Sequence, residues 1–105
     1  MKYVHVRVNG DIAKIVKQDE IVRGSNNYVC IRFMFDSAWI DKNKVVELSD
    51  VEGSSYNTVI RKSNCVVLPD EITQTSRIYL RVHGRNKGKL PQQMIVTNEV
   101  AIIQI

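Results

Sequence analysis

The sequence has no long hydrophobic segment, since its longest uninterrupted apolar runs contain four residues. A membrane-spanning helix needs about 20 such residues, so we expect neither a transmembrane segment nor a membrane partner. The first ten residues alternate between apolar and polar side chains, without the basic head and apolar segment of a signal peptide. We therefore expect synthesis in a cytoplasm, with or without later transfer into a virus particle.

Cysteine is scarce, and its placement excludes the common metal and redox motifs. Cys30 and Cys65 are far apart, with no Cys-x-x-Cys and no nearby histidine pair, which argues against a zinc knuckle and a thioredoxin-type site. Two interpretations remain: two reduced thiols packed as small hydrophobic groups, or a disulfide across the sandwich. Because no export signal is present, we expect reduced thiols.

Sequence signatures of catalysis are also missing. The chain contains no phosphate loop, dinucleotide-binding glycine motif, nucleophile elbow or His-Glu-x-x-His motif. The basic segment Gly84–Lys89 resembles a phosphate loop but has no helix after it, so we expect a hairpin turn. Acidic residues lie in polar segments without the spacing of a calcium loop and are interpreted as turn formers; they are Asp36, Asp41, Asp50 and Glu52. We expect no enzymatic activity, no cofactor and no metal site.

What is present is the composition of one ordinary globular domain. The 105 residues are 44% hydrophobic and 25% charged, a size and balance that support a single hydrophobic core. We therefore treat residues 1–105 as one domain.

The strongest pattern is alternation with period two, which is typical of half-buried β-strands. Tyr3–Val8 alternates strictly, Asn9-Gly10 favours a tight hairpin turn, and Ile12–Val16 forms the return strand. Similar short segments follow to the end of the chain: residues 28–35, 44–48, 56–61, 64–68, 77–83, 93–97 and 99–105. No helical period competes with them. The pattern predicts an all-β, antiparallel sandwich or barrel of about seven to nine short strands.

Four large side chains are predicted to belong to the structural core: Phe33, Phe35, Trp39 and Leu80. Phe33, Phe35 and Leu80 fall on the apolar sides of their strands. Trp39 follows Asp36 and Ser37, which can cap a single helical or 3₁₀ turn, so its indole can fold back as a lid. Pro69–Ile72 is predicted to form a second such turn.

Aromatic and basic side chains alternate on the outward sides of two strands. They are Tyr3, His5 and Arg7 on one and Tyr79, Arg81 and His83 on the other, with Arg85 and Lys87 nearby. If the two strands were neighbours, these residues would form one patch able to bind single-stranded nucleic acid or a carbohydrate by stacking and charge. The net charge of +4 is scattered along the chain, so solubility is the simpler explanation of the charge.

The order of several segments resembles a known family. The segments are the strand after Gly24 that ends Ile31–Asp36, then Trp39, then Lys44–Val46, Cys65–Ile72, Ile78–Gly84 and Met94–Asn98. This succession, covering roughly residues 24–105, resembles the small β-sandwich domains of tail, baseplate and fibre proteins of phages and prophages of Gram-positive bacteria. The resemblance implies an immunoglobulin-like sandwich that docks a longer component into the virion.

By that resemblance the chain is expected to be a non-enzymatic structural or adaptor module of a virion. Its expected partners are other virion proteins, including copies of itself, and its expected location is the virus particle. The alternative is a small basic β-domain that binds single-stranded nucleic acid or carbohydrate. Family domains usually precede further domains, so the chain is either a whole small protein or part of a longer one.

Overall fold

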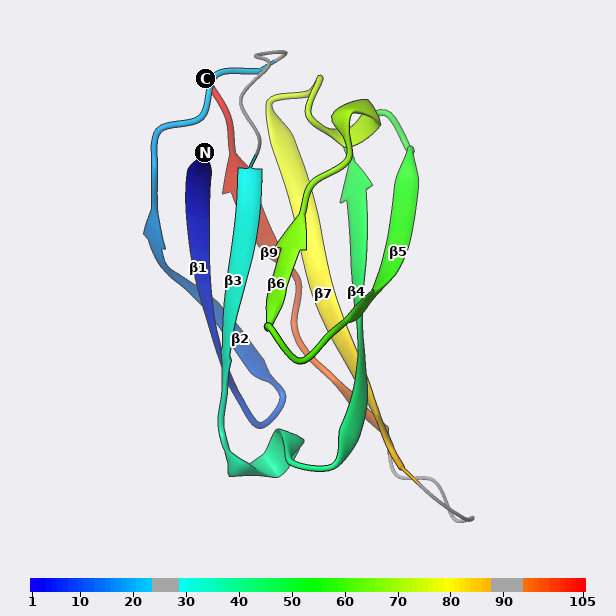
Figure 1. Cartoon of the computed structure of the whole chain (residues 1–105). Helices are drawn as coiled ribbons and strands as arrows, with labels where there is room; N and C mark the ends of the chain where they lie inside the picture. Colours follow the sequence, from blue (N-terminus) through cyan, green and yellow to red (C-terminus); the bar gives the residue numbers. More distant parts are fainter. Residues whose placement is uncertain (24–28, 88–93) are drawn as a thin grey trace.

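The computed structural model describes residues 1–23, 29–87 and 94–105, which form two β-sheets packed face to face (Figure 1). Sheet A has the strand order β2-β1-β3-β6, and sheet B the order β5-β4-β7-β8, with β9 also paired to β7. The bounds in sheet A are β1 (Lys2–Asn9), β2 (Ile12–Gln18), β3 (Val29–Phe35) and β6 (Cys65–Val67). Those in sheet B are β4 (Lys42–Asp50), β5 (Ser55–Ile60), β7 (Arg77–Asn86), β8 (Met94–Val96) and β9 (Val100–Ile103). The prediction of an all-β sandwich of about seven to nine strands is confirmed.

One strand pair departs from the predicted antiparallel arrangement. The hairpin formed by β1 and β2 is present, but β1 pairs with β3 in parallel, from Lys2 opposite Val29 to Val8 opposite Phe35. The reason is the path of the chain: β2 returns to the end where β1 began, and β3 then starts from that end (Figure 1). The first strand is therefore central in its sheet, with a partner on each side.

The predicted turn at Gly84–Lys89 is also wrong in its first half. Gly84, Arg85 and Asn86 continue β7 and pair with β4, and Gly84 and Arg85 also pair with β8. The alternation of inward and outward residues in β7 continues at Gly84, which is buried. The predicted turn at residues 24–27, Tyr28, and residues 88–93 lie outside the described residues.

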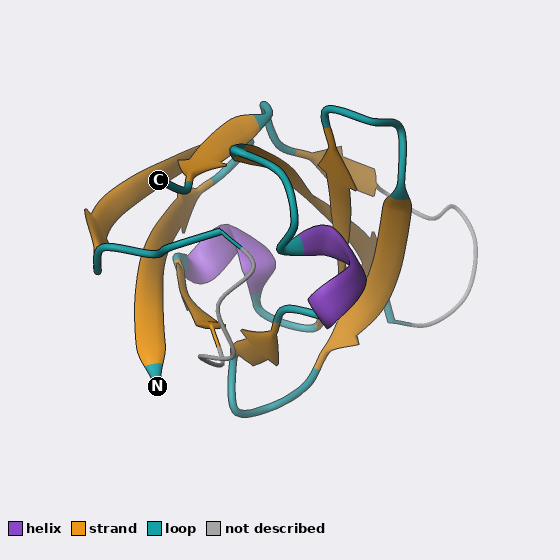
Figure 2. Cartoon of the chain, turned by 90° about the horizontal axis from the view of Figure 1, so that it is seen from above, coloured by secondary structure: helices purple, strands orange, loops and turns teal. Residues whose placement is uncertain are grey.

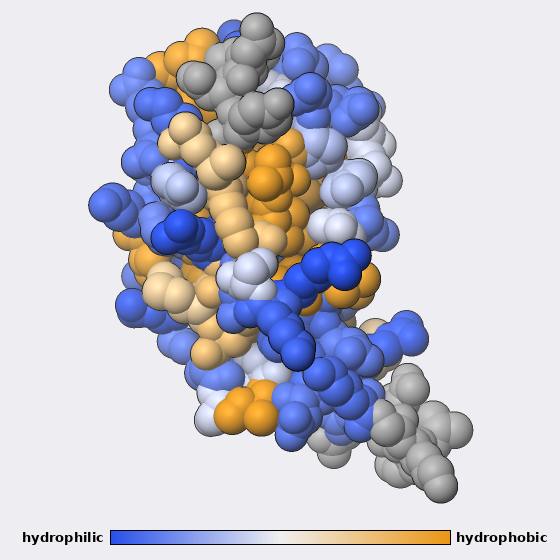
Figure 3. All heavy atoms as spheres, in the orientation of Figure 1, coloured by the Kyte–Doolittle hydropathy of each residue, from blue (hydrophilic) through white to orange (hydrophobic). Residues whose placement is uncertain are grey.

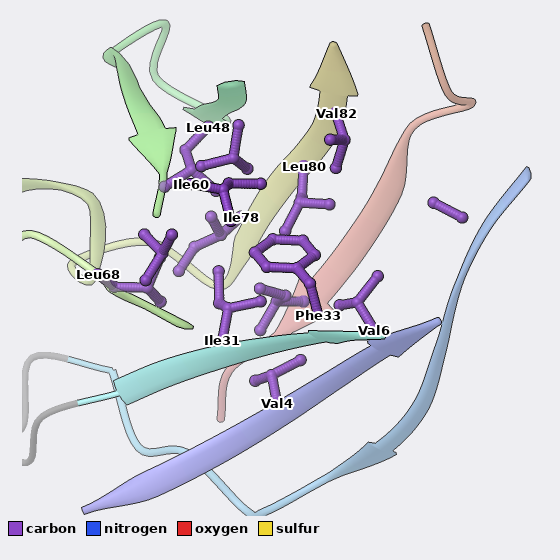
Figure 4. Close-up of a cluster of buried hydrophobic side chains, with 14 of the residues drawn as sticks. Val4, Val6, Ile31, Phe33, Leu48, Ile60, Leu68, Ile78, Leu80 and Val82 are labelled. Atoms are coloured by element: carbon purple, nitrogen blue, oxygen red, sulfur yellow. The ribbon is translucent and has the colours of Figure 1, made fainter. Parts of the chain in front are cut away.

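The core consists of the inward side chains of both sheets. Phe33 of β3 points across the sandwich toward Leu80 of β7 (Figure 4), and the two are 4% and 0% exposed. Phe35 was predicted to be core as well, but it is only half-buried and packs against the cluster from its margin, because it ends β3 where the sheets diverge. Fully buried valines of β1 complete the layer: Val4, Val6 and Val8.

Two 3₁₀ turns close the two ends of the sandwich (Figures 1 and 2). They are η1 (Ser37–Trp39) and η2 (Asp70–Ile72), as predicted for both segments. Each contributes one large side chain to the core, and Trp39 and Ile72 are both 1% exposed. Trp39 donates its indole N–H to the carbonyl of Gly10 at 2.8 Å, so the polar edge of the buried ring is satisfied.

Asn98 closes the side of the sandwich between β2 and the break that separates β8 from β9. Its side-chain oxygen accepts the amide of Ala13 at 2.7 Å, and its side-chain nitrogen donates to the carbonyl of Ala13 at 3.1 Å. At the same break the hydroxyl of Thr97 accepts the amide of Val82 at 3.0 Å. The side chains of Thr97 and Asn98 thus make hydrogen bonds that the backbone of a continuous strand would otherwise make.

The expectation of two reduced cysteines is wrong: Cys30 and Cys65 form a disulfide. The bond does not cross the sandwich either, because both residues lie in sheet A. Arg32 is the register partner of Cys65, which puts Cys30 two residues away on the neighbouring strand and on the same outer face. The two Cα atoms are 6.4 Å apart, a separation that a disulfide spans.

No helix in the described part of the chain has the length and apolar character required to span a membrane.

Candidate functional site

The single aromatic and basic patch considered from the sequence is not formed. Its two halves lie in different sheets, because β1 belongs to sheet A and β7 to sheet B. Since both sets of side chains point outward, they occupy opposite outer faces of the sandwich. Each face has to be considered by itself.

The outer face of sheet A is basic. Tyr3, His5 and Arg7 alternate along β1, and their neighbours across the sheet are Cys30, Arg32 and Met34 of β3. On the other side of β1, Lys17 and Lys14 of β2 stand opposite His5 and Arg7. The guanidinium carbon of Arg32 lies 4.6 Å from the centre of the Tyr3 ring, a cation–π contact, and the Tyr3 and His5 rings are 6.2 Å apart.

The outer face of sheet B carries paired charges and exposed apolar groups. The ring nitrogen Nε2 of His83 donates to the carboxylate of Glu47 at 2.8 Å, and Arg81 lies 3.8 Å from Glu99. A shallow hollow of about 330 Å³ surrounds the His83–Glu47 pair. The hollow is lined by Asn43, Val45, Glu47, Asn57, His83, Arg85 and Met94.

A row of three valines and one histidine, called here the apolar row, crosses this face at right angles to its strands. In register order it runs Val59, Val45, His83 and Val96, taking one residue from each of four neighbouring strands. Val59 and Val96 are 58% and 42% exposed, and Met94 beside the row is 54% exposed. Tyr79 lies further along β7, next to Ala101 of β9. This set of side chains is referred to below as the sheet B face.

A basic groove that no single segment of the sequence indicates lies at the lower end of the sandwich. It has a volume of about 700 Å³ and is lined by Lys42, Asn43, Lys44, Val59, Ile60, Arg61, Lys62, Ser63, Asn64 and Lys87. The five basic residues come from β4, from the turn between β5 and β6, and from the end of β7. Figure 3 shows hydrophilic residues gathered over the lower right of the molecule, around this turn.

Of the predicted surface residues, only Lys87 lines the basic groove; the other four cations are Lys42, Lys44, Arg61 and Lys62. Pairing brings them together: Lys44 stands opposite Ile60, which precedes Arg61, and Lys42 stands opposite Asn86, which precedes Lys87. Two short patterns in the sequence could have indicated these residues: the Lys-x-Lys of residues 42–44, in β4, and the Arg-Lys pair of residues 61–62, which follows β5. They become informative only once the two strands are known to pair.

Two of the lysines in the groove contact neutral side chains. Lys42 donates to the side-chain oxygen of Asn86, and the ammonium of Lys44 lies 5.1 Å from the centre of the Phe35 ring. The carboxylates of Glu99 and Glu47 contact Arg81 and His83 instead, on the sheet B face. None of the described residues that line the groove carries a carboxylate. Its unbalanced positive potential suits an anionic ligand.

Within residues 1–23, 29–87 and 94–105, no group of three or more His, Cys, Asp or Glu side chains is arranged to hold a metal ion. The acidic residues do form turns, as predicted: the carboxylate of Asp50 accepts the amides of Glu52 and Ser54, each at 2.9 Å.

No protein-family model matches the chain, and no curated protein shows significant similarity to it.

Proposed function

We propose that this protein is a non-enzymatic structural or adaptor module of a phage or prophage virion, present there in several copies that contact one another. The order of segments that resembles phage tail, baseplate and fibre domains supports the proposal. The role requires a rigid domain with a surface suited to contact with protein, and the sandwich supplies both.

The observation that carries the proposal is the sheet B face. It presents the apolar row from Val59 to Val96, with Met94 and Ile103 exposed by 54% each, on the outer side of sheet B. Exposed apolar groups of this kind, surrounded by charged residues, are typical of interaction surfaces. Burial of the row against another subunit would remove its apolar area from water.

A second copy of this chain is the occupant that the face suits best. Glu47 and Glu99 lie on it beside Arg77, Arg81 and Arg85, so a two-fold arrangement can place an acid of one copy against a base of the other. The domain measures 43 × 25 × 20 Å. Its two longer dimensions enclose a projected area of about 1,000 Å², compared with the roughly 800 Å² that each partner buries in a stable interface.

Sedimentation velocity over a range of concentrations tests this contact. We expect the wild-type chain to form a discrete oligomer and the double variant Val96→Glu/Ile103→Glu to sediment as a monomer. The control is Ile12→Glu, which adds a carboxylate to an apolar residue of sheet A that is 64% exposed. It should leave the oligomer intact. A wild-type chain that remains monomeric at every concentration would contradict self-association through this face.

The location is tested separately, by mass spectrometry of virus particles purified from cells that carry the gene. The proposal requires peptides of this chain in particles that have been separated from soluble protein on a density gradient. Particles assembled without the chain would remove the virion assignment, whatever its oligomeric state.

A further inference from the structure

We propose that the basic groove binds the phosphate backbone of a single-stranded nucleic acid, whose bases then reach the outer face of sheet A. The groove meets the sheet B face at Val59, but the proposal does not depend on the proposed function. The proposal combines the charge of the groove, its continuity with a second hollow, and the aromatic and guanidinium groups that the second hollow leads to.

Charge is the first part of the argument. Lys42, Lys44, Arg61, Lys62 and Lys87 line one groove of about 700 Å³, and none of the described residues that line it is acidic. Phosphate groups that enter such a groove release the counterions that accompany a free strand. Arg61, Lys62 and Lys87 are exposed, so their charged ends can reach a ligand without rearrangement of the fold.

Continuity is the second part. Ser63 and Asn64 line the basic groove and also a neighbouring hollow on sheet A, which is lined further by His5, Arg32 and Met34. The turn between β5 and β6 therefore lies between the basic groove and the hollow on sheet A, and lines both. A strand that lies in the groove can pass over this turn and continue onto sheet A, where Arg7, Lys14 and Lys17 carry on the positive charge.

The aromatic and guanidinium groups on sheet A favour a single-stranded ligand over a duplex. The Arg32 guanidinium lies over the Tyr3 ring at 4.6 Å, and the Tyr3 and His5 rings are adjacent at 6.2 Å. Aromatic rings and guanidinium planes stack on bases that are not already paired and stacked in a helix. A phosphate polymer without bases would use only the groove, and a duplex would not expose base faces to sheet A.

Fluorescence anisotropy with a labelled oligothymidylate of 20 nucleotides and the full chain tests the proposal. With five phosphate contacts, the affinity should fall by about 100-fold between 50 and 200 mM salt. The double variant Arg61→Gln/Lys62→Gln should lower the slope of log K against log salt by about 1.4. Both side chains are exposed, and circular dichroism and a thermal melt check that the variant is folded.

The matched control compares two single variants, Arg61→Gln and Arg23→Gln, each of which removes one positive charge, from opposite ends of the sandwich. Arg23 is exposed and lies near the C-terminus, where it donates its amide to the carbonyl of Ile105. Arg61→Gln should lower the salt slope by about 0.7, and Arg23→Gln should keep the wild-type slope. If both single variants weaken binding equally, net charge explains the binding and the groove is not its site.

Competition identifies the ligand class. Unlabelled oligothymidylate should displace the probe at lower phosphate concentration than inorganic polyphosphate or duplex DNA, and Tyr3→Leu should abolish that preference. Equal displacement by polyphosphate, stronger binding of the duplex, or no binding at 50 mM salt would each overturn the proposal. Val96→Glu/Ile103→Glu should disrupt the oligomer and spare the oligonucleotide site, because neither residue lines the basic groove. Failure of either proposal can therefore be distinguished from failure of the other.

Discussion

Gly84 of β7 and Trp39 of η1 are packed so closely that no side chain fits between them. A Cβ atom on Gly84 would lie 2.4 Å from Cζ3 of the indole and 3.0 Å from Cε3. The φ angle of Gly84 is not in the positive region, so the requirement for glycine comes from space and not from backbone conformation. Close approach of a buried ring to a strand backbone fixes η1 against sheet B.

We predict that Gly84→Ala lowers the free energy of unfolding by about 1–3 kcal/mol, the usual cost of overpacking a core. The measurement is chemical denaturation of both proteins. Arg85→Ala, at the next and exposed position of β7, is the control and should change stability little. In a Trp39→Phe background the smaller ring leaves room for the methyl group, so the cost of Gly84→Ala should shrink; an unchanged cost would contradict the steric explanation.

Asp36 joins the first hairpin to η1 and is the subject of a second prediction. One carboxylate oxygen accepts the amide of Gly10 at 3.0 Å and the other the amide of Ala38 at 3.2 Å. We expect Asp36→Ala to destabilise the fold by about 1–2 kcal/mol, since it removes a cap and a link to the hairpin. Asp36→Asn keeps one side-chain oxygen as an acceptor and should cost less. Melting temperatures equal to that of the wild type for both variants would show that these bonds contribute nothing.

Asn98 provides a third test, because its side chain substitutes for a strand partner of Ala13. Asn98→Ala should lower the free energy of unfolding by about 1–2 kcal/mol, since both backbone groups of the buried Ala13 lose their side-chain partner. Amide hydrogen exchange at Ala13 should become faster by a larger factor than exchange in β4. Asn57→Ala, at an exposed position on sheet B, is the control. Unchanged exchange at Ala13 would exclude this role for Asn98.

The disulfide gives the fourth prediction. The bond closes a loop between residues separated by 35 positions, and its restriction of the unfolded chain is worth about 3–4 kcal/mol. Reduction, or replacement of both Cys30 and Cys65 by Ala, should lower the unfolding midpoint accordingly. Alkylation of the denatured protein with and without prior reduction checks the pairing. Two thiols that react without reduction, in protein purified under air with no reductant, would contradict it.

Local patterns were sufficient for most of the fold because they depend on neighbours in the chain. Alternation predicted the strands around Val4, Ile31 and Leu80, and the Asn-Gly pair predicted the first turn, where Gly10 has φ +57°. Asp36 and Ser37 predicted the short turn that carries Trp39. Strand limits were less accurate, as at Gly84, because pairing to neighbours on both sides extends a strand beyond what its own residues indicate.

The site depended on contacts between distant segments, which a local pattern does not encode. The outward residues of β1 and β7 have the same chemistry, yet they separate onto opposite faces because their strands enter different sheets. The cations of the basic groove are unremarkable in sequence and come together through the pairing of β4 with β5 and β7. The cysteines were predicted to be reduced because the only available argument was the absence of an export signal. Their bond follows instead from the pairing of β3 with β6.

The sequence by itself determined that this chain forms half-buried strands around an apolar core, with turns at defined residues, because side-chain direction and turn preference are properties of adjacent residues. The tertiary structure alone decided the parallel pairing of β1, the disulfide, the sheet B face and the basic groove. These depend on which strands become neighbours, a choice set by the packing free energy of the whole sandwich and not by any one segment.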